Sequence, residues 1–309
     1  AARLLEDHGL VYGMDEIIVS NGAKHSLYNT FQAILDPGDE VIVDKPCWVS
    51  YPEMVRMAGG VPVFLDCPES QGFLPSMADL EKLITPRTKA IVFNNPTNPT
   101  GMGYDGKTLE LLARVAQEHN LLIAADEIYT TYLYEGDFRP IRTLPGMAER
   151  TITLNSFSKN FLMTGWRVGV IIAEPELLAV MNRINGSLIY SAPSVSQRAA
   201  IQALAMRKEI REKYVTAYRD RIFYAADRIE KLPYLSLVRP KGTFYLFPGV
   251  EKTGLDEKAF CKVLLDQAHV LVSPGTPFGV SAAGHFRIAC TVGIDQLKTA
   301  FDRMEKLSF

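Results

Sequence analysis

The sequence predicts an α/β protein whose larger part is a three-layer α/β/α sandwich with a mostly parallel sheet. Short apolar runs alternate with helical patterns through the first 190 or so residues, as in "DEVIVD", "KAIVFNN" and "TITLNS". This alternation predicts parallel strands joined by helical crossovers. The runs are almost entirely apolar, as expected of strands that are covered on both faces.

Seven runs are expected to be strands, and helical periodicity follows the first four of them. The expected strands span residues 16–22, 39–44, 61–67, 89–95, 121–126, 151–156 and 165–173. The expected helices in this part of the chain span residues 23–35, 47–60, 76–84 and 106–120.

The pattern changes after about residue 190, where a smaller α+β domain is expected. One long, charge-rich helical pattern covers residues 194–232, and a strand is expected within 242–250. A helix at 256–270, a strand at 285–291 and a terminal helix at 294–307 follow. A length of 309 residues also predicts about two domains. We place the boundary inside the long helical pattern, with a large domain at 1–205 and a small domain at 206–309.

The first residues, "AARLLEDHGL", have the pattern of a helix that ends at Gly9. No capping residue precedes this pattern. We therefore expect the chain to begin inside the large domain, which would then be truncated at its N-terminus.

Composition excludes several classes of function. The net charge of −2 gives no reason to expect a nucleic-acid or membrane partner. The longest apolar runs are strand-sized, and no secretory signal opens the chain. The four cysteines and five histidines are scattered, without metal-ligand spacing. These observations predict a cytoplasmic protein without disulfides and without a metal site.

Polar side chains gather where four of the expected strands end. They lie in residues 21–24, 94–101, 126–129 and 156–159. Ligands of open α/β sheets bind beyond the carboxyl ends of the strands. Turn chemistry alone also explains Asn, Gly and Ser at such positions. The lysine at 159 makes the set more specific than turn chemistry requires.

A glycine pattern in the same region offers a different hypothesis. "GMGYDG" (101–106) matches G-x-G-x-x-G, follows a strand, and is followed by Asp126 at the end of the next strand. However, "NPTNPTG" separates that strand from its first glycine. The gap is too long for the tight turn of a dinucleotide site, so we reject that interpretation.

Lys159 lies in "SFSK" among small and apolar residues, although a surface lysine in a loop is the ordinary alternative. Ser156, Ser158 and Arg167 suit a phosphate, since serine and arginine both donate to anions. The turn at 22–24 adds the N-terminus of a helix to the same place. A lysine beside a phosphate site, with Asp126 on the adjoining strand, predicts pyridoxal 5′-phosphate (PLP).

The motifs "SFSKNFLMTGWRVG", "NPTNPTG" and "ADEIY" together resemble the PLP-dependent aminotransferases of fold type I, classes I and II. "SNGAKHSL", "DPGDEVIV", "WVSYPEMV" and "FRIAC" look like the prokaryotic aspartate aminotransferase branch. The resemblance covers essentially the whole chain. It implies the PLP-dependent transferase type I fold and a ping-pong transfer of an amino group from an L-amino acid to a 2-oxo acid. It also implies a homodimer.

The resemblance implies a role for each matching residue. Lys159 forms the Schiff base with the cofactor, while Asp126 pairs with the ring nitrogen. Asn98 and Tyr129 bond the phenolic oxygen of the cofactor. The other implied contacts are a ring stack by Trp48, phosphate contacts by Gly22, Ala23, Lys24, Ser156, Ser158 and Arg167, and a carboxylate clamp on the substrate by Arg287 with Asn98. The Asn98–Pro99 bond is expected to be cis. Trp48 as a core residue and Arg287 as a surface residue remain the alternatives.

The substrate is less well defined by the sequence. Lys24 matches a lysine that meets a distal carboxylate in the aspartate aminotransferase branch, which favours an acidic donor such as aspartate or glutamate. A lysine that serves the cofactor phosphate explains the same residue equally well. Ala23 departs from the glycine that is common at this position, and aromatic or alanine-type donors remain open. A PLP-dependent carbon–sulfur lyase and a non-catalytic PLP-binding regulatory domain are the alternative functions.

Overall fold

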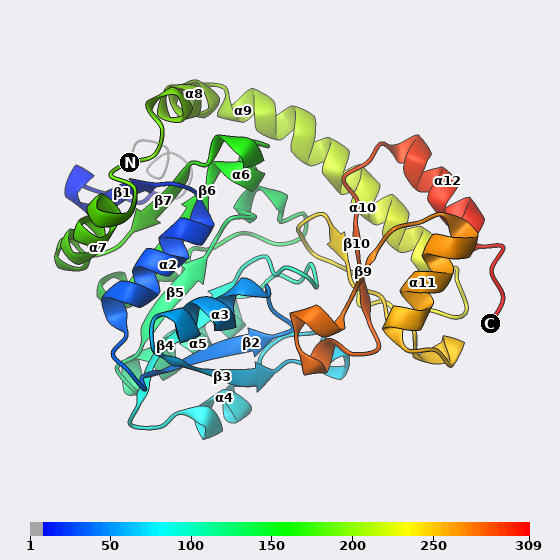
Figure 1. Ribbon diagram of the computed structural model, residues 1–309, viewed down its shortest axis with the longest axis horizontal. Coiled ribbons are helices and arrows are strands. Elements are labelled where there is room, and N and C mark those ends of the chain that lie inside the picture. The colour runs from blue at the N-terminus through cyan, green and yellow to red at the C-terminus, as the bar shows by residue number, and fades with distance from the viewer. Residues whose placement is uncertain (1–8) are drawn as a thin grey trace.

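The computed structural model describes residues 9–309, and these residues form two sheets covered by helices (Figure 1). The helical pattern predicted before Gly9 falls on residues 1–8, outside the described residues. The larger sheet has seven strands and the smaller one has three.

The larger sheet runs in the order β1-β7-β6-β5-β4-β2-β3. Strand β7 is antiparallel to both of its neighbours, and β2 to β6 are parallel. The strands are β1 (Ile17–Ser20), β2 (Glu40–Lys45), β3 (Val61–Asp66), β4 (Thr88–Asn94), β5 (Leu122–Asp126), β6 (Thr151–Ser156) and β7 (Gly169–Ile172). All seven strands predicted from the sequence are therefore present.

Helices cover both faces of this sheet, which explains its nearly continuous apolar strands. One core joins the sheet to α2 (Ala23–Ile34), α3 (Ser50–Met57) and α7 (Pro175–Leu188). A second core joins the other face to α4 (Met77–Leu83) and α5 (Gly106–Glu118). Successive strand residues alternate between the two cores, as Val41 and Ile42 do on β2.

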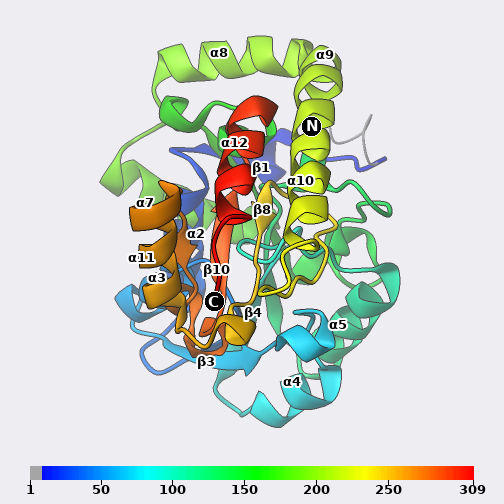
Figure 2. The same ribbon diagram turned by 90° about the vertical axis from the view of Figure 1, so that its right-hand side faces the viewer.

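A bent helical run connects the two sheets. It consists of α8 (Ser194–Ala205), α9 (Arg207–Ile210), a π-helical segment (Arg211–Val215) and α10 (Thr216–Ile229). Figures 1 and 2 show the chain turning sharply between α8 and α9, after which α10 reaches the smaller sheet. The predicted domain division at residue 205 coincides with the end of α8, and it stays a prediction.

The smaller sheet has the strand order β8-β10-β9 and antiparallel pairing. Its strands are β8 (Tyr245–Leu246), β9 (Ser273–Pro274) and β10 (Phe286–Ala289). It shares one core with α10, α11 (Glu257–Ala268) and α12 (Ile294–Met304). The sequence predicted the last two helices and the strand at 285–291, but it gave no sign of the short β9.

The structure adds one long helix that the sequence analysis did not predict. Helix α7 begins with Pro175 in its first turn, where proline is well tolerated. Its second half contains the sequence "NRINGS", whose Asn, Gly and Ser have low helix propensity. Burial of Leu178 and Met181 in the first core holds this helix on the sheet nevertheless.

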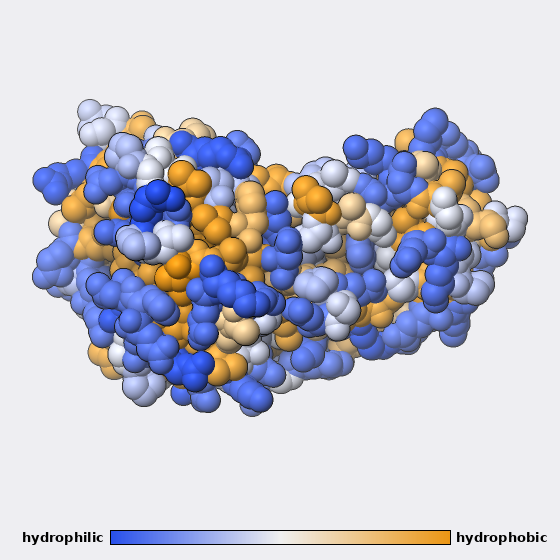
Figure 3. Space-filling view, turned by 90° about the horizontal axis from the view of Figure 1, so that it is seen from below, coloured by the Kyte–Doolittle hydropathy of each residue, from blue (hydrophilic) through white to orange (hydrophobic). Residues whose placement is uncertain are grey.

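The two halves give an elongated molecule, and Figure 3 shows apolar residues gathered on the lower face of the half that contains the larger sheet. In the described part of the chain, we find no helix long and apolar enough to cross a membrane.

Candidate active site

Lys159 stands in a short turn at the carboxyl end of β6. Helix α6 (Phe157–Asn160) begins directly after this strand, and the Ser156 hydroxyl caps it by accepting a hydrogen bond from the Ser158 amide. The Tyr132 hydroxyl donates to the Lys159 carbonyl over 2.9 Å. The lysine side chain is half-buried, with Nζ 5.8 Å from the centre of the Phe244 ring.

This environment lowers the pKa of the Lys159 amine. Burial is the main cause, because an ammonium loses its hydration there, and the positive charges of Arg287 and Arg167 add to it. Arg287 lies on β10 of the smaller sheet, and Arg167 lies just before β7 of the larger one. The amine is thus influenced by cations from both halves of the molecule.

A cradle for an anion lies beside this turn, at the N-terminus of α2. Gly22 precedes the helix with φ of +91°, and a Cβ there would approach Arg167 Nη2 to 2.4 Å. The Arg167 guanidinium itself donates to the Thr164 and Asn21 carbonyls. The first-turn amides of a helix have no carbonyl partner within it, so they and this guanidinium face the same region.

Gly169 explains the last position of the G-x-R-x-G motif. It pairs with both Ser20 and Ser156 in the sheet. A Cβ at this position would lie 2.6 Å from the carbonyl carbon of Gly22 and 2.9 Å from the amide nitrogen of Ala23. Only glycine therefore allows β7 to approach the start of α2 this closely.

Asp126 ends β5 and is almost fully buried. Its Oδ2 accepts a hydrogen bond from the Tyr51 hydroxyl over 2.5 Å, whereas Oδ1 has no hydrogen-bond partner among the described residues. Burial raises the pKa of this carboxyl to about 6, and the Tyr51 hydrogen bond partly opposes the rise. The carboxylate is therefore placed to gain from a further, preferably cationic, N–H donor.

Arg287 and Tyr129 are linked through Tyr245. The Arg287 guanidinium lies between the rings of Tyr245 and Phe278, at 4.5 and 4.8 Å from their centres. The Tyr245 hydroxyl lies 3.3 Å from the Tyr129 hydroxyl. Burial is the main reason why the pKa of Tyr129 is raised. Arg287 is thus half-buried and packed against two aromatic rings, and its role as a substrate clamp stays a prediction.

Asn98 holds the other side of Arg287. Its Oδ1 accepts a hydrogen bond from Arg287 Nη1 over 2.9 Å, while its backbone N–H donates to Asn94 Oδ1 over 2.8 Å. Arg287 Nε is buried and has no partner in the part of the chain that the structure describes. The Asn98–Pro99 bond is cis, as predicted, and Lys45–Pro46 and Asn95–Pro96 are also cis.

Trp48 and Lys24 form a pair at the edge of the cradle. Trp48 is half-buried and packs edge-on against Tyr51, with ring centres 5.4 Å apart. The Lys24 ammonium lies 5.0 Å from the centre of the Trp48 ring, and the lysine is exposed. Tyr51 therefore contacts both Trp48, through its ring, and Asp126, through its hydroxyl.

Contacts and electrostatic effects connect most of the residues singled out in the sequence. The charges of Arg167 and Arg287 lower the pKa of Lys159. Arg287 donates a hydrogen bond to Asn98, and the Arg167 guanidinium packs against Gly22. Ser156 is engaged internally, because its hydroxyl donates to the Val168 carbonyl over 3.1 Å. Sequence reasoning missed Tyr51 and Tyr245. The motif "WVSYPEM" contains Tyr51 three residues after Trp48, but nothing in it indicates a bond to Asp126.

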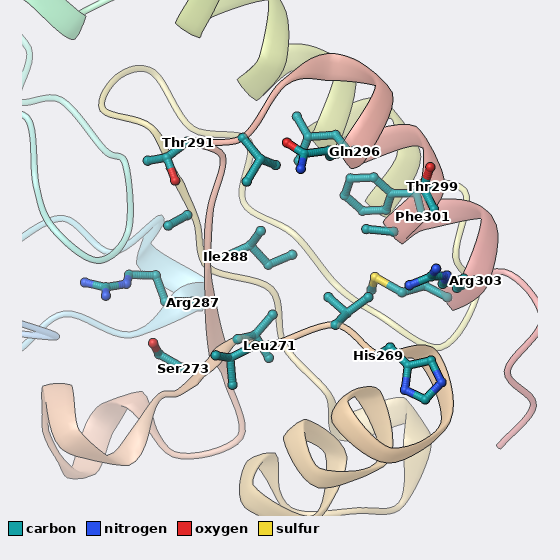
Figure 4. Close-up of a pocket in the computed structure, with 17 residues that line it drawn as sticks. His269, Leu271, Ser273, Arg287, Ile288, Thr291, Gln296, Thr299, Phe301 and Arg303 are labelled. Atoms are coloured by element: carbon teal, nitrogen blue, oxygen red, sulfur yellow. The ribbon is translucent and has the colours of Figure 1, made fainter.

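A cavity of about 740 Å³ lies elsewhere, against α12 and the smaller sheet (Figure 4). Figure 4 shows Arg287 at its margin, with the guanidinium pointing away from the apolar side chains of Leu271 and Ile288. The Arg287 guanidinium bonds Asn98, so this cavity is not the place where the sequence motifs meet.

Comparison with known proteins agrees with this arrangement. The family model "Aminotransferase class I and II" matches residues 1–304. The aspartate/prephenate aminotransferase of Thermus thermophilus is 41% identical over 99% of this chain and 79% of its own. The aspartate aminotransferase of Geobacillus stearothermophilus is 37% identical over 98% of this chain and 79% of its own.

Two solved structures show the same fold. The aspartate aminotransferase from Thermus thermophilus with maleate has a TM-score of 0.93 and 40% identity, covering 99% of this chain and 79% of that one. The aromatic aminotransferase from Pyrococcus horikoshii has a TM-score of 0.96 and 35% identity, covering 99% and 83%. The chain belongs to the class I and II aminotransferase family, and it is an aminotransferase with the type I fold of that family.

The raised pKa of Asp126 predicts a pH-dependent contribution to stability. The folded protein holds this proton more tightly than the unfolded chain, with a pKa of about 6 against 3.8. The contribution is therefore fully present below pH 3.8 and is lost as the pH rises through 6. We expect the free energy of unfolding of the wild type, minus that of Asp126→Asn, to fall by about 2–3 kcal/mol between pH 4 and 7. Urea titrations of the cofactor-free proteins measure this difference, and a difference that stays flat or grows would contradict the assignment.

Proposed function

We propose that this aminotransferase uses PLP and transfers the amino group of an acidic L-amino acid, aspartate or glutamate, to a 2-oxo acid. The observation that carries the proposal is the half-buried amine of Lys159, whose pKa is lowered by burial and by the two nearby guanidinium groups. A nucleophilic lysine must be neutral, and such an environment favours the neutral form.

The residues present fit PLP, because three features of the site match three parts of that cofactor. Asp126 Oδ1, buried and without a partner among the described residues, suits the N–H of a pyridinium ring. The first turn of α2 and Arg167 suit the phosphate. The Lys159 amine suits the aldehyde carbon.

Each side chain of the site then has a proposed role toward the cofactor. Lys159 would hold it covalently, and Asp126, itself oriented by Tyr51, would hold the ring nitrogen. Tyr129 and Asn98 would bond the phenolic oxygen, and Trp48 would cover one ring face. Gly22, Ala23, Lys24, Ser158 and Arg167 would hold the phosphate. Ser156 would act through the turn that it caps, since its hydroxyl proton is engaged with Val168.

Proton transfer is the chemical task of the protein itself. When bound, PLP supplies an electron sink for the pair left at the Cα atom of the amino acid. The neutral Lys159 Nζ removes the proton from that Cα as a general base, and then returns a proton as a general acid. Arg287 orients the substrate by a bidentate contact with its α-carboxylate, to which Nε is free to donate. Partial burial of the amine limits competing protonation by water.

Two observations support an acidic donor. Lys24 places an exposed ammonium at the edge of the site, where it can meet a distal carboxylate. A related enzyme, the aspartate aminotransferase from Thermus thermophilus, has been solved with maleate, which is a dicarboxylate. An aromatic donor is the second candidate, since the aromatic aminotransferase from Pyrococcus horikoshii has the same fold at 35% identity. The related proteins named above are aminotransferases, which favours amino transfer over the carbon–sulfur lyase and the regulatory domain.

The proposed substrate assignment predicts a selective effect of Lys24→Gln. Loss of one charge-assisted contact is worth about tenfold, so kcat/KM for aspartate should fall by about that factor. The kcat/KM for alanine, which has no distal carboxylate, should stay within about twofold of its wild-type value. Steady-state assays with 2-oxoglutarate as acceptor measure both. Equal losses for both donors, accompanied by weaker PLP binding, would instead assign Lys24 to the cofactor phosphate.

We also propose that two copies of the chain form a dimer with twofold symmetry. Several large apolar side chains are exposed on α7, on α8, in the connection between these helices and in the segment before Arg167, namely Trp166, Leu188, Tyr190, Val195 and Ile201. Ile201 also borders an apolar groove of about 260 Å³ between α8 and the strands β1 and β7. We expect light scattering to give the mass of a dimer, and Ile201→Glu to shift it toward the monomer. A monomeric wild type would refute the proposal.

Removal of Lys159 tests the proposed function directly. The wild type mixed with PLP should show a visible absorbance band that changes when the preferred amino donor is added. Lys159→Ala should lack that band and amino-transfer activity, because no amine remains to hold the cofactor. Lys208→Ala, which removes an exposed lysine of α9, is the matched control and should behave as the wild type. A band that persists in Lys159→Ala would show that a different lysine carries the cofactor.

A further inference from the structure

Asn160, the residue next to Lys159, has a buried amide group whose atoms are all engaged. Its side chain is 4% exposed. Its Nδ2 donates to Asn155 Oδ1 over 2.9 Å and to Thr130 Oγ1 over 3.3 Å. Its Oδ1 accepts from the Thr131 hydroxyl over 2.8 Å and from the Thr131 amide over 3.3 Å. Such a fully satisfied amide inside a protein specifies one arrangement of its surroundings.

These bonds connect two turns that are distant in the sequence. One turn is α6, which carries Lys159, and the other is the 3-10 turn Thr130–Tyr132, which directly follows Tyr129. The Tyr132 hydroxyl makes a second connection by donating to the Lys159 carbonyl. Asn155, the third partner of the amide, belongs to β6 and so relates both turns to the sheet.

Helix α6 needs such external contacts because it has only four residues. A helix this short is not stable through its own hydrogen bonds. Its position, and therefore the position of the Lys159 backbone, depends on what holds it from outside. Asn160 supplies four of the contacts that do so, and it is separated from Lys159 by a single peptide bond.

We propose that Asn160 is a positioning residue for the amino-transfer reaction, whose amide fixes the turn of Lys159 against the turn of Tyr129. The proposal rests on the function proposed above, in which Lys159 is the reactive amine. Asn160 itself touches neither cofactor nor substrate. It acts by holding the Lys159 amine at one place between the Phe244 ring, Arg287 and Arg167.

As a consequence, the position and the pKa of the Lys159 amine depend on a hydrogen-bond network in which the amine itself takes no part. The charged groups that act on this amine are Arg287 from β10 and Arg167 from the segment before β7. The uncharged groups around it are Phe244 beside Nζ and Tyr132 at its carbonyl. If the turn moves outward, the amine gains water, and its pKa should return toward the ordinary value.

If Asn160 only stabilised the fold, its replacement would lower thermal stability without changing the pKa of Lys159 or kcat. Asn185 provides the comparison, since it is also a buried asparagine, 3% exposed, and donates to the Tyr190 carbonyl over 3.0 Å. It lies on α7, outside the site described above. Replacement of either asparagine by alanine removes a buried amide and lowers thermal stability. Only replacement of Asn160 should change the chemistry of Lys159.

The test compares the wild type with Asn160→Ala, Asn185→Ala and Thr131→Val. The first measurement is the pKa of the Lys159 amine in the cofactor-free chain, from competitive labelling with acetic anhydride followed by peptide mass spectrometry at several pH values. The second is the kinetics of amino transfer by the PLP-loaded enzyme. Thr131→Val removes only the shortest of the four contacts, so it preserves the test if Asn160→Ala does not fold.

We expect Asn160→Ala to raise the pKa of Lys159 and to lower kcat at least tenfold, because small displacements of a catalytic group are costly. The KM of the amino donor should change less than about twofold, since Arg287 and Asn98 are untouched. Thr131→Val should act in the same direction but more weakly, and combining it with Asn160→Ala should add little. Asn185→Ala should leave both the pKa and kcat unchanged.

Failure of the positioning role and failure of the proposed function give different results. If Asn160→Ala and Thr131→Val both keep the wild-type pKa and kcat, the positioning role is wrong while the proposed function stands. If the wild type itself shows an ordinary lysine pKa at residue 159 and no absorbance change with PLP, the proposed function fails, and the positioning role fails with it.

Discussion

The site depends on one constraint, which is that a half-buried lysine amine experiences the positive charges of two guanidinium groups. Burial alone lowers the pKa of Lys159, and Arg287 and Arg167 lower it further. Both arginines are also suited to bind anions, one toward Asn98 and the other at the start of α2. The charges suited to bind anionic ligands are therefore also charges that lower the pKa of the Lys159 amine. An anion bound at either arginine would offset part of this effect, so ligand binding and the protonation of Lys159 are coupled.

The fold satisfies this constraint by bringing the two sheets together at one place. Lys159, Asp126 and the cradle at α2 come from the strand ends of the larger sheet, whereas Arg287 comes from the smaller one. Gly169 and Gly22 allow the strand that follows Arg167 to contact the start of α2, because any side chain at either residue would occupy that contact. The G-x-R-x-G motif is thus a steric requirement of the anion cradle as much as a source of the arginine.

The larger sheet and the residues at its strand ends were predictable from the sequence for a simple physical reason. Parallel strands that are covered on both faces are apolar throughout, and their carboxyl ends share one edge of the sheet. Lys159, Asp126 and Asn98 could be found because each lies at the end of such a strand or within four residues of it. The resemblance to a known family was needed for Arg287, since its strand lies in a different sheet. Helix α7 was missed because low-propensity residues in its second half obscure a helix that tertiary packing stabilises.

The supporting contacts could not be predicted, because they join residues far apart in the chain. Tyr51 and Asp126 are separated by 75 residues, and Tyr129 and Tyr245 by 116. Asn160 and Thr130 are 30 residues apart, and only the packing of two turns brings them together. Local periodicity contains no information on such pairs. These contacts nevertheless fix the positions of the side chains singled out in the sequence, so the sequence pointed to the proposed reacting groups more completely than to the groups that orient them.

The most direct test of the central claim is to locate the covalent link between protein and cofactor. The wild type loaded with PLP is treated with sodium borohydride, which converts a lysine–PLP link into a stable one, and its peptides are then analysed by mass spectrometry. The account predicts that the cofactor is found on the peptide that contains residue 159 and on no other in stoichiometric amount. Stoichiometric modification of another lysine, with residue 159 left unmodified, would contradict it.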